Sequence, residues 1–128
     1  MKKRGFALVE ILVVITILAA LAIIAFTSFD KTKVKSDQNR AIAYLRAIRT
    51  AEKLYWPRWK TYAACANISA INTTLGVEIQ LPNYSFSVAS GTSTTFTATA
   101  DTTGTTNDLT IDQDGAFTKG GAAFTPSY

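Results

Sequence analysis

Histidine is absent from this chain of 128 residues, and cysteine occurs once, as Cys65. A single cysteine excludes an intramolecular disulfide and a cysteine-based metal cluster, and it leaves the redox compartment undetermined. No glycine-rich phosphate loop follows a predicted strand, and Cys65 has no base partner in the sequence. Because no catalytic constellation is present, we predict neither an enzyme nor a cofactor or metal site.

Charged residues are absent from residues 11–29, and glycine and proline are absent from residues 6–56. As a helix, the uncharged run would be about 28 Å long, close to the thickness of the hydrocarbon core of a bilayer. Lys2, Lys3 and Arg4 precede it, so the positive-inside bias predicts a single-pass segment with a cytoplasmic N-terminus. The rest of the chain would then lie on the far side of the membrane.

Helical periodicity continues after the apolar run, over residues 30–56. The recurring apolar residues are Val34, Ala41, Tyr44, Leu45, Ile48, Ala51 and Tyr55. With no glycine or proline to interrupt them, residues 6–29 and this amphipathic part are predicted to form one continuous helix. Pro57 should end it, because proline lacks the amide donor and disfavours the helical conformation of its predecessor.

Residues 57–81 are expected to form a connecting loop region, with a short helix or an irregular loop over Ala63–Leu75. Residues 82–128 then show the alternation of apolar residues that is typical of half-buried strands. The alternating residues are Tyr84, Phe86 and Val88, then Phe96, Ala98 and Ala100, then Leu109, Ile111 and Phe117. We therefore predict an α+β fold, in which the long N-terminal helix packs on a small antiparallel β-meander of three or four strands.

Glu10 stands between the basic start and the apolar run, and two ordinary readings compete to explain this arrangement. A secretory signal peptide would use the small residues at Ala20 and Ala22, but the run is longer than the usual apolar core and Glu10 stands where that core should begin. A plain membrane anchor explains the length, and Glu10 could then snorkel to the interface.

A third reading gives Glu10 a role. If the chain is cut after Gly5, the new amino group on Phe6 lies one helical turn from Glu10. The two opposite charges could pair within one chain or between neighbours. Pairing between neighbours would fix the register of packed helices, because an unpaired buried carboxylate is costly.

The stretch "KKRGFALVEILVVITIL", with the apolar residues that follow it to about Phe29, resembles the class III signal of type IV prepilins and of the pseudopilins of type II secretion. In that family a membrane peptidase cuts after the glycine, the new phenylalanine is N-methylated, and the glutamate guides assembly. The resemblance therefore implies that residues 1–5 are a cleaved leader, Gly5 precedes the cut, Phe6 is N-methylated and Glu10 is the assembly carboxylate.

The chain departs from many relatives in the apolar segment, where a helix-breaking glycine and proline are common. This chain has Ala19 and Thr27 at the corresponding places. Alanine is a strong helix former and threonine keeps its amide donor, so the intrinsic reason for the helix to loosen is weaker here.

The resemblance implies a structural subunit of a type IV pilus-like filament, which is a helical homo-oligomer. The precursor would be a single-pass inner-membrane protein, and the assembled filament would be extracellular. The implied partners are a prepilin peptidase and the inner-membrane assembly machinery. Removal of three leader cations from a formal charge of +4 leaves +1 and takes away a cytoplasmic anchor.

Several alternatives stay open at this point. Major pilin, minor pilin and pseudopilin share the same helix, as do roles in adhesion, twitching, DNA uptake and secretion. A secreted soluble binding domain released by ordinary signal peptidase is the main rival of another class, and a DNA-binding minor pilin is a further one.

Two other motifs have a chemical and a structural interpretation. Asp112-Gln113-Asp114-Gly115 resembles a fragment of a calcium loop, but Asp-Gly is a strong hairpin signal and we predict a turn.

The second motif combines aromatic and basic residues near the end of the helix: Tyr55, Trp56, Trp59 and Tyr62 with Arg49, Lys53, Arg58 and Lys60. These could bind nucleic acid. The favoured interpretation is that the rings pack on the sheet while the cations meet the acidic C-terminal half of the same or the next subunit.

Overall fold

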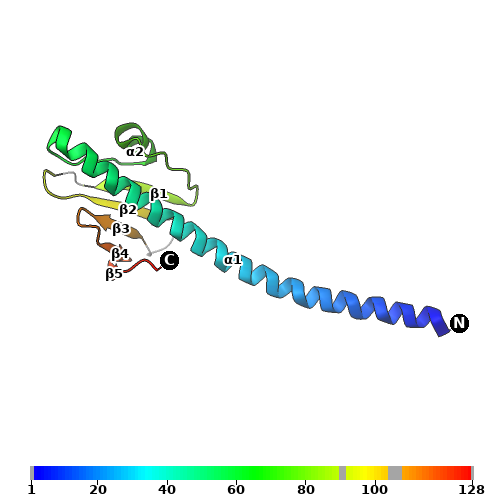
Figure 1. Ribbon diagram of the computed structural model, residues 1–128. Helices are drawn as coiled ribbons and strands as arrows, with labels where there is room; N and C mark the ends of the chain where they lie inside the picture. The colour runs from blue at the N-terminus through cyan, green and yellow to red at the C-terminus, as the bar shows by residue number, and fades with distance from the viewer. Residues whose placement is uncertain (1, 90–91, 104–107, 128) are drawn as a thin grey trace. The chain divides into compact units, whose positions relative to one another are not determined.

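A computed structural model describes residues 2–89, 92–103 and 108–127 (Figure 1). The chain divides into two compact units, Met1–Ser36 and Asp37–Tyr128. Helix α1 (Lys2–Trp59) supplies the described part of the first unit and the beginning of the second. The expected continuous helix is therefore present, and it passes Ala19 and Thr27 without a break.

The two threonine hydroxyls within the apolar run of α1 form hydrogen bonds within the helix itself. The Thr16 hydroxyl donates to the Val13 carbonyl at 2.7 Å, and the Thr27 hydroxyl donates to the Ile24 carbonyl at 3.0 Å. These bonds allow both hydroxyl groups to lie in an apolar environment without an external partner.

The second unit contains the rest of α1, a short helix and one antiparallel sheet. The further elements are α2 (Ile68–Leu75), β1 (Tyr84–Ala89), β2 (Thr97–Thr102), β3 (Leu109–Asp112), β4 (Phe117–Lys119) and β5 (Ala122–Phe124). The strands follow one another in the sheet in the order β1-β2-β3-β4-β5, so the sheet is a meander. The α+β fold class and its antiparallel sheet are thus confirmed.

The predicted number of three or four strands was wrong, because β5 forms a fifth. Gly120 and Gly121 have φ values of 57° and 82° and make the tight turn between β4 and β5. Two central residues with positive φ are what a type I′ hairpin turn requires. A strand of three residues after two glycines is too short to show alternation, which is why the sequence pattern did not predict it.

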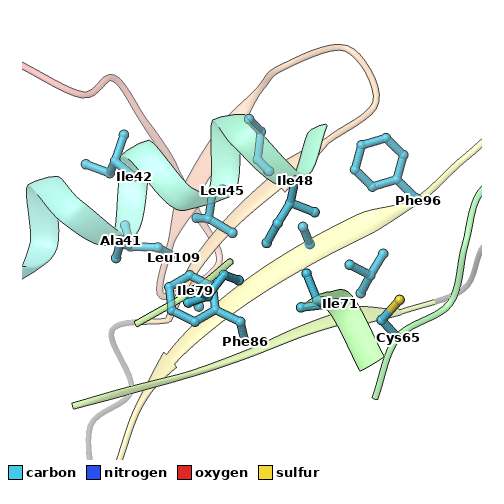
Figure 2. Close-up of a cluster of buried hydrophobic side chains, with 14 of the residues drawn as sticks. Ala41, Ile42, Leu45, Ile48, Cys65, Ile71, Ile79, Phe86, Phe96 and Leu109 are labelled. Carbon is cyan, nitrogen blue, oxygen red and sulfur yellow. The ribbon is translucent and has the colours of Figure 1, made fainter. Parts of the chain in front are cut away.

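The core of the second unit lies between α1 and the sheet. Figure 2 shows Leu45 and Ile48 of α1 facing Phe86 and Leu109 of the sheet. The strand residues at the alternating apolar positions are buried, with Tyr84 partly so. These buried residues are Phe86, Val88, Phe96, Ala98, Ala100, Leu109, Ile111 and Phe117. The predicted pattern of inward-facing residues is confirmed on all three strand segments.

The helical periodicity predicted the buried face of α1 less well. Val34 is 66% exposed and lies in the first unit, so it is not part of the core. Ile42 is buried although the pattern did not single it out, because the helix buries a face wider than the predicted stripe.

α1 continues past Pro57 to Trp59, which corrects the predicted end at Trp56. Proline removes one hydrogen bond, but contacts with the rest of the unit hold the last turn. The Trp56 indole Nε1 donates to the Ser93 carbonyl at 2.7 Å. The helix then stops at Lys60, whose φ is 57° and whose amide donates to the Trp56 carbonyl.

Helix α2 occupies part of the expected connecting region. The Asn67 side chain caps its start by accepting from the Ala70 amide at 2.9 Å, and Gly76 with a φ of 68° ends it. Ile71 is fully buried, so α2 contributes to the same core.

Glu52 is a buried acid on the core-facing side of α1. Its Oε2 accepts from the Ala63 amide at 2.9 Å, whereas its Oε1 is buried without a hydrogen-bond partner among the described residues. Burial raises the pKa of the Glu52 carboxyl, and the Ala63 hydrogen bond opposes the rise. Burial and the neighbouring Glu52 also raise the pKa of the Cys65 thiol.

The buried position of Glu52 predicts a pH dependence of stability. A carboxyl whose pKa is higher in the folded state binds more protons there than in the unfolded state. Its contribution to stability is therefore fully present below the unfolded pKa and is lost as pH rises through the raised folded pKa. Urea unfolding of the full chain in detergent, followed by the combined fluorescence of Trp56 and Trp59 from about pH 4 to about pH 8, should show this decline.

Glu52→Gln should remove this part of the pH dependence, because the amide can still accept from Ala63 but does not titrate. Glu78→Gln is the matched control, since Glu78 is exposed and should leave the profile unchanged. Equal pH profiles for the wild type and Glu52→Gln would contradict the assignment.

Candidate processing and assembly site

Gly5, Phe6 and Glu10 lie on α1 in the first unit. Phe6 and Glu10 are separated by one helical turn, and both border a shallow hollow along one face of the helix together with Val9, Val13 and Val14. The structure therefore brings the residue after the predicted cut and the predicted assembly carboxylate to the same face. Glu10 is exposed, so its carboxylate is accessible to a neighbouring chain.

Glycine at position 5 has no explanation in the fold of the chain. A Cβ atom added to Gly5 would meet nothing within 4 Å. A glycine inside a helix is less favourable than alanine by about 1 kcal/mol, so it locally weakens the helix. The packing of the described residues therefore gives no reason for glycine at this position.

The apolar surface around this site is exposed within the chain. Exposed fractions of the large hydrophobic side chains in the first unit run from 47% for Val13 to 77% for Phe6. The most apolar 18-residue window of α1 has a mean hydropathy of 3.0, and none of it is buried. By length and composition this helix could cross a membrane. A helix that is apolar on every side requires lipid or other protein around it.

The Asp112–Gly115 segment forms the predicted hairpin turn between β3 and β4 (Figure 1). Asp112 Oδ1 accepts from the amides of Asp114, Gly115 and Ala116, at 3.0, 2.9 and 2.9 Å. One carboxylate oxygen thus satisfies three backbone donors, which accounts for the aspartate at this position.

The structure divides the predicted cluster of rings and cations. Trp56 and Tyr62 serve the fold: Trp56 bonds to Ser93, and the rings of Tyr62 and Phe96 lie 4.9 Å apart. Trp59 is 60% exposed and stacks on Tyr55 at 5.9 Å.

At least one of the cations turns toward the acidic half of the same chain. Arg49 Nε donates to the Gln113 carbonyl at 3.2 Å, at the β3–β4 turn. The favoured structural interpretation is therefore confirmed for Arg49 and Tyr62, and Tyr55 also packs against the hydrophobic core.

Glu52 is the titratable residue that the sequence reasoning missed. It follows Leu45 and Ile48 at the helical spacing of the buried face, and this spacing was the available signal.

Two comparisons with known proteins bear on this site. Residues 1–26 match the family described as the prokaryotic N-terminal methylation motif. The chain is also 36% identical over 66 residues to the type IV major pilin protein PilA of Myxococcus xanthus (strain DK1622). That match covers 52% of this chain and 30% of the relative, so the chain spans less than a third of the length of that protein.

The N-terminus thus resembles the N-methylation motif, and the matched residues include Gly5, Phe6 and Glu10. The chain that bears it is a homologue of a type IV major pilin, and its long helix with an antiparallel sheet is a pilin-like fold. Neither match is to an enzyme, in agreement with the absence of a catalytic constellation from the sequence.

The role of Asp112 in the turn predicts a difference between two neighbouring aspartates. Asp112→Ala should lower the free energy of unfolding by about 1–3 kcal/mol, because three backbone amides lose their acceptor. Asp114→Ala removes an exposed carboxylate and should change stability by less than about 0.5 kcal/mol. Urea unfolding of both variants measures the difference, and equal stabilities would contradict the account of the turn.

Proposed function

We propose that this chain is a structural subunit of a type IV pilus-like filament. It is made as a precursor that is inserted in the inner membrane through residues 11–29. A prepilin peptidase cuts it after Gly5, Phe6 is N-methylated, and the inner-membrane assembly machinery then adds the subunit to an extracellular filament.

The observation that carries the proposal is the fully exposed apolar helix directly behind a class III signal. The apolar helix alone would not suffice, since a membrane anchor or a secretory signal peptide would also be apolar. Together they indicate a helix that is stored in lipid and later covered by other copies of itself. Exchange of lipid for neighbouring helices keeps the apolar surface out of water at each stage.

Glu10 sets the register in this scheme. Once the leader has been removed, the Phe6 amine is the one new positive charge near the start of the apolar helix. A neighbour's Glu10 can pair with it only at one axial offset, because any other offset leaves both charges unpaired in apolar surroundings. The exposed position of Glu10, one turn from Phe6, leaves it free for such a pair.

N-terminal sequencing and intact mass of the mature chain test the processing step. The proposal predicts a chain that begins at Phe6 and carries one additional methyl group. A start after Ala22 or Ala25 would support release by ordinary signal peptidase and contradict the proposal.

Gly5→Ala tests the requirement for glycine before the cut. Processing should fall at least about tenfold, because a Cβ atom enters the space in which the protease approaches the backbone. The second unit should fold as before, since Gly5 belongs to the first unit and an added Cβ would meet nothing within 4 Å. Ala19→Gly exchanges the same two residue types within the apolar run and should be processed normally. Normal processing of Gly5→Ala would contradict the assignment.

Glu10→Ala tests assembly separately from processing. The variant should be cut and stored in the membrane, but the yield of sheared filaments should fall about tenfold or more, because the register pair is lost. Glu10→Gln should behave in the same way if charge is what matters. Thr16→Ala alters a polar residue on the same helix and should form filaments. Normal filaments from Glu10→Ala would count strongly against the register role.

A further inference from the structure

A cleft of about 530 Å³ lies in the second unit, beside the last turns of α1 and the end of α2. Its walls are mostly apolar and include Ala51, Leu54, Tyr55, Arg58, Trp59 and Leu75. Tyr55 and Leu75 also pack against the hydrophobic core. The core does not account for the rest of the cleft, since Leu54, Arg58 and Trp59 are exposed.

The cleft is bordered by large hydrophobic side chains that the second unit leaves uncovered. Leu54 is 75% exposed and Trp59 is 60% exposed. Among the residues that the structure describes in this unit, these two are the large hydrophobic residues with exposed side chains. The Tyr55 and Trp59 rings stack at 5.9 Å with an interplanar angle of 25°, which fixes an aromatic wall. Trp, Tyr and Arg together are the residues most enriched at the energetic centres of protein interfaces.

The lining favours a protein partner over nucleic acid. A groove for single-stranded nucleic acid carries several cations along the path of the backbone. Arg58 is the one cation among the described residues that line this cleft, and aliphatic side chains such as Leu54 and Leu75 fill much of the rest. The expected partner is therefore a protein segment that presents one carboxylate beside a small apolar group.

The β3–β4 turn of the same chain has this chemistry. Asp114 and Ala116 are both exposed near its tip, two positions apart. The three hydrogen bonds to Asp112 Oδ1 hold the turn in one conformation, so little conformational freedom would be lost on docking.

The turn and the cleft lie on opposite flanks of α1. Arg49 contacts the turn through Gln113, and Arg58 lines the cleft. These two arginines are nine positions apart on one helix, which at 100° per residue places them about 180° apart around its axis. Figure 1 shows α2 and the β3–β4 hairpin on the two sides of the last turns of α1. Because of this placement, a copy cannot fill its own cleft.

We propose that the cleft of one copy receives the β3–β4 turn of the next copy, with Asp114 facing Arg58 and Ala116 against the Tyr55–Trp59 ring pair. Two different surfaces that face opposite ways give a head-to-tail contact, which propagates without closing on itself. This contact rests on the proposed filament and specifies which surfaces of the second unit meet in it.

Charge reversal tests the Arg58–Asp114 pair in cells in which the full-length wild-type chain forms filaments. Arg58→Asp should lower the yield of sheared filaments about tenfold or more, because a like charge then faces Asp114 in a desolvated contact. Asp114→Arg should have the same effect. The double variant should return the yield to within about twofold of the wild type, since the pair is restored with its charges exchanged.

Asp101→Arg combined with Arg58→Asp is the matched control, because it makes the same charge change at another exposed aspartate of the sheet. Its yield should stay low. Unchanged filaments from Arg58→Asp, or equal rescue by Asp101→Arg, would overturn the docking. If Arg58→Asp leaves filaments normal but abolishes salt-sensitive DNA binding, the cleft is a nucleic-acid site instead.

Cysteine cross-linking between exposed residues gives a second test of the contact between copies. Leu54→Cys together with Ala116→Cys keeps the Arg58–Asp114 pair and should give a ladder of disulfide-linked multimers in oxidised filaments, whereas each single variant should not. Cys65 is only 1% exposed and should not contribute to the ladder. Filaments without a ladder from the double variant would overturn the contact. Absence of filaments from the wild type, with processing intact, would instead overturn the proposed function.

Discussion

The described residues leave the apolar surface of the N-terminal helix exposed, so lipid or another protein must cover it, and this constraint governs the N-terminal unit. From Phe6 to Phe29 the large hydrophobic side chains point outward on every side of α1. Lipid can cover this surface in the precursor, and other copies of the helix can cover it in the proposed filament. In the proposed scheme, the three cations at residues 2–4 favour the membrane-inserted precursor, and the Glu10 carboxylate favours the filament.

The second unit buries its hydrophobic core within itself. From Ala41 onward, one face of α1 is buried, and the sheet supplies Phe86, Phe96, Leu109 and Ile111 against it. One helix therefore has two kinds of surface along its length: residues 6–29 are exposed and apolar, and the part from Ala41 onward is amphipathic with one buried face. This division allows the proposed assembly to use the first part of α1 without disturbing the hydrophobic core that the second part completes.

The sequence predicted those features that depend on short-range patterns. Hydropathy and the absence of glycine and proline indicated α1, alternation indicated the buried strand residues, and Asp-Gly indicated the β3–β4 turn. The class III signal placed Gly5, Phe6 and Glu10 together because the motif is contiguous.

The sequence did not predict features that depend on tertiary contacts. α1 continues past Pro57 because Trp56 bonds to Ser93, far along the chain. The three-residue strand β5 depends on pairing with β4, and the burial of Glu52 depends on the Ala63 amide lying opposite it. The exposed cleft beside Leu54 and Trp59 could not be distinguished in the sequence from rings packed on the sheet.

The central claim is that residues 6–29 form the shared core of a filament in which Glu10 faces a neighbour's Phe6 amine. Helical reconstruction by electron cryomicroscopy of native filaments tests it most directly. The account predicts a bundle of apolar helices along the filament axis, with each Glu10 carboxylate within hydrogen-bond distance of the methylated amine of an adjacent subunit. Filaments whose subunits lack residues 6–29, or whose Glu10 points away from every neighbouring N-terminus, would contradict it.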